Sequence, residues 1–340
     1  MLTLETLSAA VLFSALTLYV LTGGADFGGG VWEILARGPR RQAQRDLIAH
    51  AIAPIWEANH VWLVLVIVLL FVAFPRAFAA ISIALHVPLV LLMLGIVMRG
   101  SAFVFRTYDV RPGPVQRRWT VLFAGSSVVS PIMLGVLVGA VSSGAIRVDL
   151  ATGDVPTDYI SAWLGLYPFA VGGFALALFA FLAAVYLTLE SDQRALQDDF
   201  RMRALAAQAA LAGLALLSLL LAGSRAPMIA YRLTTAGWGL PLLAATALAA
   251  AGAVAALWRR RYRIARVAAV VEAVLLLWGW GLAQYPFLVA PDLTISSAAA
   301  PRAVLAPLLG VLGLGALVLF PSLAFLYAVF KRRRRPARWS

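Results

Sequence analysis

The sequence predicts an all-α membrane protein with about nine transmembrane helices. Of its 340 residues, 62% are hydrophobic and only 13% are charged, and the mean hydropathy is +0.90. Soluble domains are about 45–50% apolar and about 25% charged, so this composition excludes a water-soluble fold. Transmembrane strands would appear as alternating segments of roughly ten residues, whereas the apolar segments here are longer and unbroken, which favours helices.

Nine apolar segments separated by charged loops define the expected helices, and the whole chain, 1–340, is expected to form a single polytopic membrane domain. Nothing basic precedes the first segment and no small-residue cleavage site follows it, so it is not expected to be a cleavable signal peptide. The expected spans are 5–26, 48–72, 77–98, 119–141, 163–188, 204–222, 238–257, 265–284 and 304–328.

Basic residues alternate between the loops on the two sides of the membrane. Four lie between the first two spans, five between the third and fourth, three between the fifth and sixth, four between the seventh and eighth with Arg266 just inside the eighth, and six after the ninth. This set holds 23 of the 28 Lys and Arg residues, so the positive-inside rule predicts an N-terminus outside and a C-terminus in the cytoplasm. The same topology accounts for the net charge of +13, and no nucleic-acid partner is expected.

Cysteine is absent, which excludes disulfides, thiolate-ligated haem, iron–sulfur clusters and cysteine-ligated zinc, and no metal site is predicted. Any cofactor would need His, Met or carboxylate ligands. Two small-xxx-small pairs, Gly24/Gly28 and Gly135/Gly139, are expected to let helix backbones approach closely.

Ionisable residues inside the spans are the first candidates for function, because a charge within a bilayer is costly. Asp26, Glu57, Arg99 and Glu272 all fall in the predicted cytoplasmic half, with Glu57 the deepest at roughly 14 Å from the boundary. Desolvated carboxyls at graded depths are typical of a proton path that ends inside the membrane. The alternative is structural: Asp26 and Arg99 pair to hold helices together, and Glu57 is a static hydrogen-bonded group.

His60 follows Glu57 by three residues and shares its helix face, so it joins the proton-path candidates. His60 and His86 are expected at similar depth on consecutive spans, where two histidines can ligate one haem; the alternative is that each only makes hydrogen bonds. Trp56 and Trp62 lie inside the second span beside these polar residues. They either shape an apolar passage suited to oxygen or simply pack.

Several motifs together resemble subunit II of the cytochrome bd-type quinol oxidases, from the first span to the ninth. Within the second span, EANH (57–60) is most similar to the cyanide-insensitive branch of that family. The motifs that carry the resemblance are GADFG (24–28), IAPIWEANHVWL (52–63), RGSAF (99–103) with FR (105–106), QYPF (284–287) and DLTI (292–295).

The resemblance implies that this chain is the non-haem half of an electrogenic terminal oxidase in a bacterial cytoplasmic (inner) membrane. The partner, subunit I, would carry the catalytic residues and three haems and form a heterodimer with this chain; a small additional subunit is compatible with the pattern. The complex would oxidise quinol and reduce oxygen to water with protons from the cytoplasm. This chain would support subunit I, help to conduct protons and oxygen, and hold a structural quinone.

Two other functions remain open from the sequence. A secondary transporter would also have many spans and a membrane carboxylate, although such folds usually show internal repeats and helices broken at the midplane, and no repeat is evident here. A purely structural assembly subunit would have the same spans and no proton chemistry of its own.

Overall fold

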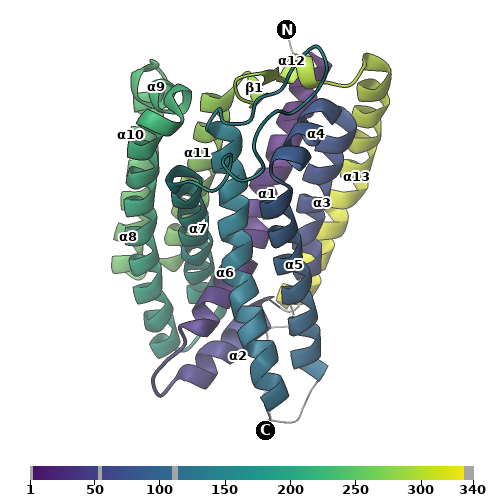
Figure 1. The fold of residues 1–340 in the computed structure, drawn as a ribbon. Coiled ribbons are helices and arrows are strands. Elements are labelled where there is room, and N and C mark those ends of the chain that lie inside the picture. Colours follow the sequence, from purple (N-terminus) through teal and green to yellow (C-terminus); the bar gives the residue numbers. More distant parts are fainter. Residues whose placement is uncertain (1–2, 53–55, 109–113, 333–340) are drawn as a thin grey trace.

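The computed structural model describes residues 3–52, 56–108 and 114–332, which form a bundle of long helices that run alternately up and down (Figure 1). Within these residues, eight helices are long and apolar enough to cross a membrane, and the number rises to nine if a bent pair of helices is counted as one span. The predicted all-α membrane fold with about nine spans is therefore confirmed.

Seven of the expected spans each correspond to one helix. Most of these helices extend beyond the apolar segment that predicted them, because hydrogen-bonded turns continue into the polar flanks. The first helix, for example, begins after Thr3, whose side chain caps it by accepting from the Thr6 backbone N–H at 3.3 Å. The seven are α1 (Leu4–Ile34), α6 (Pro114–Ser142), α7 (Leu166–Glu190), α8 (Arg194–Arg225), α10 (Gly239–Trp258), α11 (Tyr262–Gln284) and α13 (Arg302–Arg332).

The second and third expected spans, 48–72 and 77–98, are wrong in their boundaries. Four helices replace them: α2 (Arg41–Ile52), α3 (Trp56–Ala73), α4 (Pro75–Ala84) and α5 (His86–Tyr108). The axis bends by 114° between α3 and α4, where Pro75 opens α4 at a position that needs no backbone donor. Apolar residues continue across this bend, so hydropathy alone does not reveal it.

The bundle has two distinct ends (Figure 1). At one end lies α2, and we call this the α2 end. At the other, the hairpin end, β1 (Phe287–Val289) pairs antiparallel with β2 (Leu293–Thr294), followed by α12 (Ile295–Ala298). The short helix α9 (Pro227–Thr235) also lies there. Helix α1 begins at the hairpin end and α13 ends at the opposite one, as an odd number of spans requires; which end faces the cytoplasm stays a prediction.

Helix α7 packs against α1, α6, α8 and α11. Glycines permit two of these contacts: a Cβ on Gly28 would collide with the backbone carbonyl of Phe179, and one on Gly135 would lie 2.5 Å from the Val171 carbonyl. A Cβ on Gly24 or Gly139 would also lie under 3.0 Å from α7 atoms. The predicted close helix approach at both glycine pairs is thus confirmed.

Candidate functional site

The structure brings Asp26 and Arg99 together in the interior, as the sequence suggested. Each residue is only 3% exposed. The Arg99 Nη2 donates to the backbone carbonyl of Asp26 at 2.8 Å, and the Asn59 Nδ2 donates to the Asp26 Oδ2 at 2.8 Å. Asp26 therefore joins α1 to α3 through its carboxyl and to α5 through its backbone carbonyl. Asp26 lies eight residues before the end of α1, or about 12 Å from the α2 end.

Arg99 is held on its other sides by α6 and by two aromatic rings. Its Nε donates to the Ser127 Oγ at 3.2 Å, and its guanidinium carbon lies 4.8 Å from the Phe27 ring centroid and 5.1 Å from that of Phe123. A Cβ on Gly30 would collide with the Ser127 side chain, so glycine at this position lets α6 approach α1. These contacts stabilise a positive charge next to the Asp26 carboxyl within the bundle.

Glu57 is exposed and lies in the first turn of α3. The expectation that it is the deepest carboxyl, roughly 14 Å inside, is wrong because α3 begins only at Trp56, and α2, which ends at Ile52, is a separate helix. Asp26, and not Glu57, is the buried acid of the pair. The side chain of Trp56 lies outside the described residues.

His60 lies close to the Asp26 cluster, one turn into α3. Its ring is half-buried between two aromatic residues of α1, with centroid distances of 6.0 Å to Tyr19 and 5.9 Å to Phe27. His60 therefore lies beside the residues that flank Asp26, whose carboxyl accepts a hydrogen bond from Asn59, the residue before His60.

His86 is far from His60, and the expected pairing of these residues around a haem is wrong. His86 begins α5 at the hairpin end, where its ring meets the edge of the Tyr159 ring at 5.1 Å and its Nδ1 contacts the Ile83 carbonyl at 3.0 Å. The physical reason is that α3 and α4 carry the chain to the opposite end of the bundle before α5 begins.

Glu272 belongs to a second, separate polar contact. It lies on α11, is 3% exposed, and accepts a hydrogen bond at 2.7 Å from the Nε2 of Gln208 on α8. The structure therefore does not bring Glu272 into the cluster of Asp26, Asn59 and Arg99.

Trp62 is 7% exposed, and its ring lies 6.2 Å from that of Phe320 on α13. This is the packing contact that one of the two interpretations predicts. Its relation to oxygen stays a prediction.

Comparison with known proteins identifies the family. The family model described as cytochrome bd terminal oxidase subunit II matches residues 4–330. The chain belongs to this family. A putative cytochrome bd menaquinol oxidase subunit II from Bacillus subtilis is 23% identical over 350 aligned residues, covering 98% of this chain and 97% of the relative.

Two further comparisons agree. A cytochrome bd ubiquinol oxidase subunit 2 of B. subtilis is 30% identical over 171 residues; this alignment spans 49% of the chain and about half, 48%, of that relative. A chain of the bd oxidase structure from Geobacillus thermodenitrificans shares the fold with a TM-score of 0.81 at 23% identity, covering 96% of this chain and 98% of that one.

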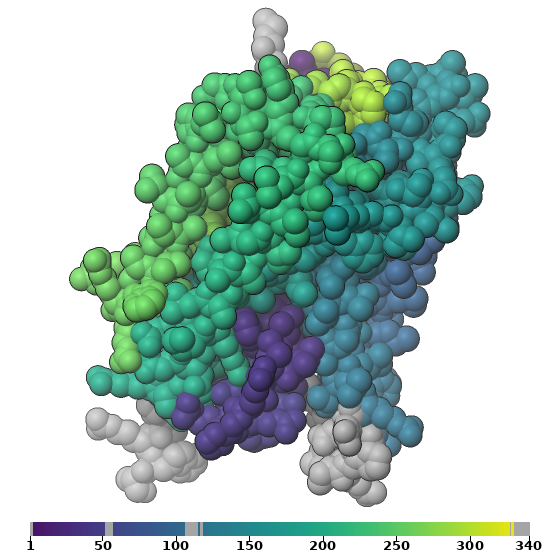
Figure 2. Space-filling model, turned by 60° about the vertical axis from the view of Figure 1, so that its left-hand side comes forward, coloured from purple at the N-terminus to yellow at the C-terminus, as the bar shows by residue number. Residues whose placement is uncertain are grey.

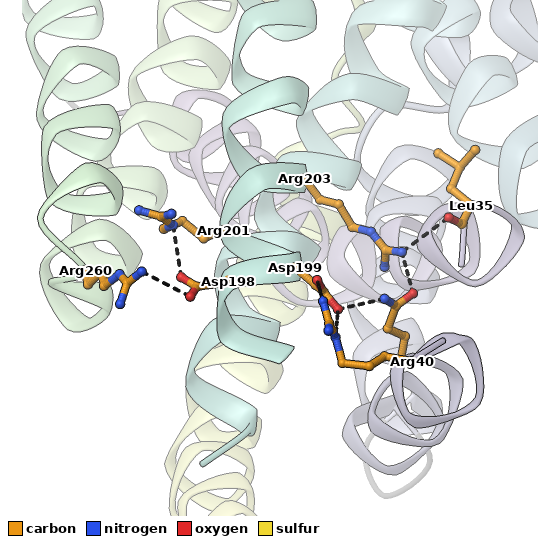
Figure 3. A network of polar contacts seen from close by, with 8 residues as sticks. Leu35, Arg40, Asp198, Asp199, Arg201, Arg203 and Arg260 are labelled. Carbon is orange, nitrogen blue, oxygen red and sulfur yellow. Dashed lines mark hydrogen bonds and ion pairs between the residues drawn. The ribbon is translucent and has the colours of Figure 1, made fainter. Parts of the chain in front are cut away.

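In this member of the bd oxidase subunit II family, an ion-pair network fixes the segment that leads to the site. Arg40, between α1 and α2, makes a forked contact with Asp199 of α8, at 2.6 and 2.8 Å (Figure 3). Gln44 of α2 donates to the same carboxylate at 2.8 Å and accepts from Arg203 at 2.6 Å. Figure 2 shows the α1–α2 segment in purple against the lower part of α8. This network positions α2, the element before Glu57.

Sequence reasoning missed several of these polar partners. Asn59 lies inside an apolar span and was visible only as part of the EANH motif, while Ser127 and Gln208 are uncharged residues that give no signal in a search for membrane charges. Only their contacts with Arg99 and Glu272 reveal them.

Proposed function

We propose that this bd oxidase subunit II takes up protons through the cluster of Asp26, Asn59 and Arg99, from the side of the membrane that α2 faces. The supporting observation is a carboxyl that is 3% exposed and accepts from an amide, in a residue whose backbone carbonyl accepts from a buried cation, about 12 Å from the α2 end and near the exposed Glu57. By the positive-inside rule, the α2 end is the cytoplasmic one.

Each residue of the cluster, and each of its neighbours Glu57 and His60, has a distinct place in this proposal. Glu57, exposed in the first turn of α3, collects protons from water. Asp26 accepts a proton and releases it toward the interior, and Asn59 keeps its carboxyl oriented with the 2.8 Å hydrogen bond. Arg99 stabilises the ionised form between transfers, because a charge in a low-dielectric interior needs a nearby opposite charge. His60 is the neighbouring group on the inner side.

The wider complex follows from the family. We propose a heterodimer in a bacterial inner membrane, with a haem-bearing subunit I that carries three haems, oxidises quinol and reduces oxygen to water. Two B. subtilis relatives bear the names of quinol oxidase subunits, which supports this assignment. A small additional subunit and the cyanide-insensitive behaviour suggested by EANH (57–60) remain part of the proposal.

The partner assignment is tested by purifying the complex through a tag on the C-terminal tail and recording a reduced-minus-oxidised absorbance spectrum. We expect haem bands together with a larger second polypeptide, and loss of the bands from this chain when the two are separated. Haem that stays with this chain alone would contradict the assignment, and so would the absence of both haem and partner, which would favour a secondary transporter.

A half-open groove at the side of the bundle suits a structural quinone. This cavity of about 730 Å³ lies between α1, α3, α5, α6 and α11, with an almost entirely apolar wall that includes Leu16, Leu63, Leu137 and Trp280. Such a wall suits an isoprenoid tail, and the few polar side chains at the wall, His60 among them, are available to a ring carbonyl. A quinone there would supply redox-active carbonyls or act only as an apolar filler. Quinone extraction from the purified complex tests for it.

Oxygen access is a further part of the proposal. Because oxygen is apolar, it partitions into the bilayer, and a route beside Trp62 would start from lipid. A raised apparent KM for oxygen in Trp62→Ala would support this route. An unchanged KM would leave Trp62 with the packing role that its contact with Phe320 shows.

The proton role is tested with Asp26→Asn and Glu57→Gln, which remove a titratable group and keep the shape. Reconstituted complexes are compared for oxygen consumption and for proton uptake from the α2 side. We expect Asp26→Asn to lose most of both and Glu57→Gln to lose less, because water reaches its exposed position. Wild-type uptake in both variants would contradict the role, whereas loss of assembly alone would indicate a pure scaffold.

A further inference from the structure

The hydroxyl of Tyr19 is a buried polar group that nothing above uses. Tyr19 is 0% exposed, and its Oη has no hydrogen-bond partner within the residues that the structure describes. A buried hydroxyl without a partner costs about 1–3 kcal/mol. Phenylalanine would fill the same space without that cost, so packing alone does not explain tyrosine at this position.

The Tyr19 ring is directed along α1 toward Asp26. A Cβ on Gly23 would lie 2.7 Å from the Tyr19 Cε2, which shows that the ring lies over the following turn of its own helix. Asp26 is in the next turn beyond Gly23, on the same face of α1 as Tyr19. Tyr19 is thus seven residues, about two turns, deeper in the bundle than Asp26 when measured from the α2 end.

His60 links this phenol to the large cavity. Its ring is edge-on to the Tyr19 ring, at 6.0 Å and 78°, and His60 also contributes to the cavity wall. Leu16, one turn before Tyr19 on α1, lines the same cavity. Tyr19 and His60 therefore lie between the Asp26 carboxyl and the apolar cavity. None of the described residues that line this cavity carries a carboxyl group.

From this arrangement we propose that Tyr19, together with His60, relays protons from Asp26 toward the cavity side of the bundle. The inference rests on the proposed proton role of Asp26. A phenol both accepts and donates, so a proton arriving at the Tyr19 oxygen from Asp26 through bound water is matched by departure of the hydroxyl proton, also through bound water, to the His60 ring. The phenol ends neutral, the Asp26 carboxyl ends ionised beside Arg99, and no electron is transferred.

The test is Tyr19→Phe in the intact complex, with single-turnover proton uptake and thermal unfolding measured on the same preparation. We expect uptake to slow on the order of a hundredfold, the lower end of what a positioned proton-transfer group contributes. The unfolding temperature should stay the same or rise, because the variant removes a hydroxyl that makes no hydrogen bond to the described protein. A structural role would instead lower the unfolding temperature.

Tyr186→Phe is the matched control. The Tyr186 hydroxyl on α7 also contacts α1, by donating to the Leu21 carbonyl at 3.2 Å, but it lies outside the Asp26 cluster. This variant should lose a little stability and keep wild-type uptake. Gly23→Ala is a second probe, since it displaces the Tyr19 ring while the hydroxyl is kept, and it should slow uptake like Tyr19→Phe.

Asp26→Asn in the same assay distinguishes failure of the Tyr19 relay from failure of the proposed proton role of Asp26. Slow uptake in Asp26→Asn with wild-type uptake in Tyr19→Phe would overturn the relay and leave the proposed function intact. Wild-type uptake in both would overturn both. Slow uptake in Tyr19→Phe at unchanged stability, with Tyr186→Phe unaffected, is the result that the relay requires.

Discussion

Two carboxyls are buried to the same extent, 3% exposed, but their partners differ. Asp26 on α1 has a neutral donor, Asn59, and a cation, Arg99, next to it. Glu272 on α11 has an amide donor from Gln208. Helix α7 packs against α1, α8 and α11, and so contacts the helices of both sites.

Burial alone is therefore not the ground for proposing proton transfer at Asp26. The Asp26 site also has a nearby cation, an exposed acid and His60 beside a cavity, and the proposed proton transfer uses all three. At the other site, the Glu272 Oε2 and the Gln208 Oε1 are buried and lack a hydrogen-bond partner among the described residues. One proton on Glu272 would supply a donor for a second bond to Gln208, so we expect a neutral acid–amide pair that joins α8 to α11.

Arg99→Met is expected to lower the stability of the complex more than any other substitution proposed here. If it left stability unchanged, the Asp26 site would not differ from the Glu272 site in needing a cation. It leaves the Asp26 carboxyl in the interior without its cation and the Ser127 hydroxyl without its donor. Removing one partner of a buried charged contact costs about 3–5 kcal/mol, so the assembled complex should unfold at a much lower temperature. Arg99→Lys keeps the charge and should lose less. Equal unfolding temperatures for Arg99→Met and wild type would refute the role of the cation.

Gly28→Ala tests the contact that places the Asp26 site against α7. An added methyl would collide with the Phe179 carbonyl, and overpacking of this kind costs about 1–3 kcal/mol. Gly213→Ala on α8 is the control, because nothing lies within 4 Å of the added Cβ, and it should be neutral or slightly stabilising. The unfolding temperatures of the Gly28→Ala and Gly213→Ala complexes check this prediction. Similar unfolding temperatures would mean that α1 can move away from α7 without loss of stability.

Substitutions of Glu272 sharpen the comparison. Glu272→Gln keeps a donor and an acceptor facing Gln208, so we expect a stability change below about 1 kcal/mol and normal turnover. Glu272→Ala leaves the Gln208 amide unpaired and should cost about 1–3 kcal/mol. Thermal unfolding and oxygen consumption are the measurements. If Glu272→Gln lost turnover at normal stability, Glu272 would carry protons as the sequence first suggested.

The smallest effect is expected for Arg40→Ala at the α2 end. Although its contact with Asp199 is forked, the Arg40 side chain is 47% exposed, and exposed ion pairs contribute little to stability. The loss should shrink at high salt, since exposed charges are screened. Arg41→Ala, also exposed, is the control. A loss that is unchanged by salt would show that packing, and not charge, holds α2 in place.

The sequence predicted the fold class, seven span positions and the pairing of Asp26 with Arg99, because charges in apolar segments and loop arginines are direct signals. It misplaced Glu57 and His86 because the apolar character of 48–98 hides the break before α3 and the bend at Pro75. It gave no sign of Gln208 or of the Tyr19 hydroxyl. Their importance depends on what lies opposite them in space, and no periodicity in the chain reports that.

The most direct test of proton uptake through Asp26 compares Asp26→Asn with Glu272→Gln. Single-turnover proton uptake is followed with a pH-indicator dye on the α2 side of the reconstituted complex. Both variants replace one buried carboxyl by an amide of the same shape. We expect proton uptake to be lost or strongly slowed in Asp26→Asn and to keep its wild-type rate in Glu272→Gln. Equal rates in the two variants, or loss only in Glu272→Gln, would contradict proton uptake through Asp26.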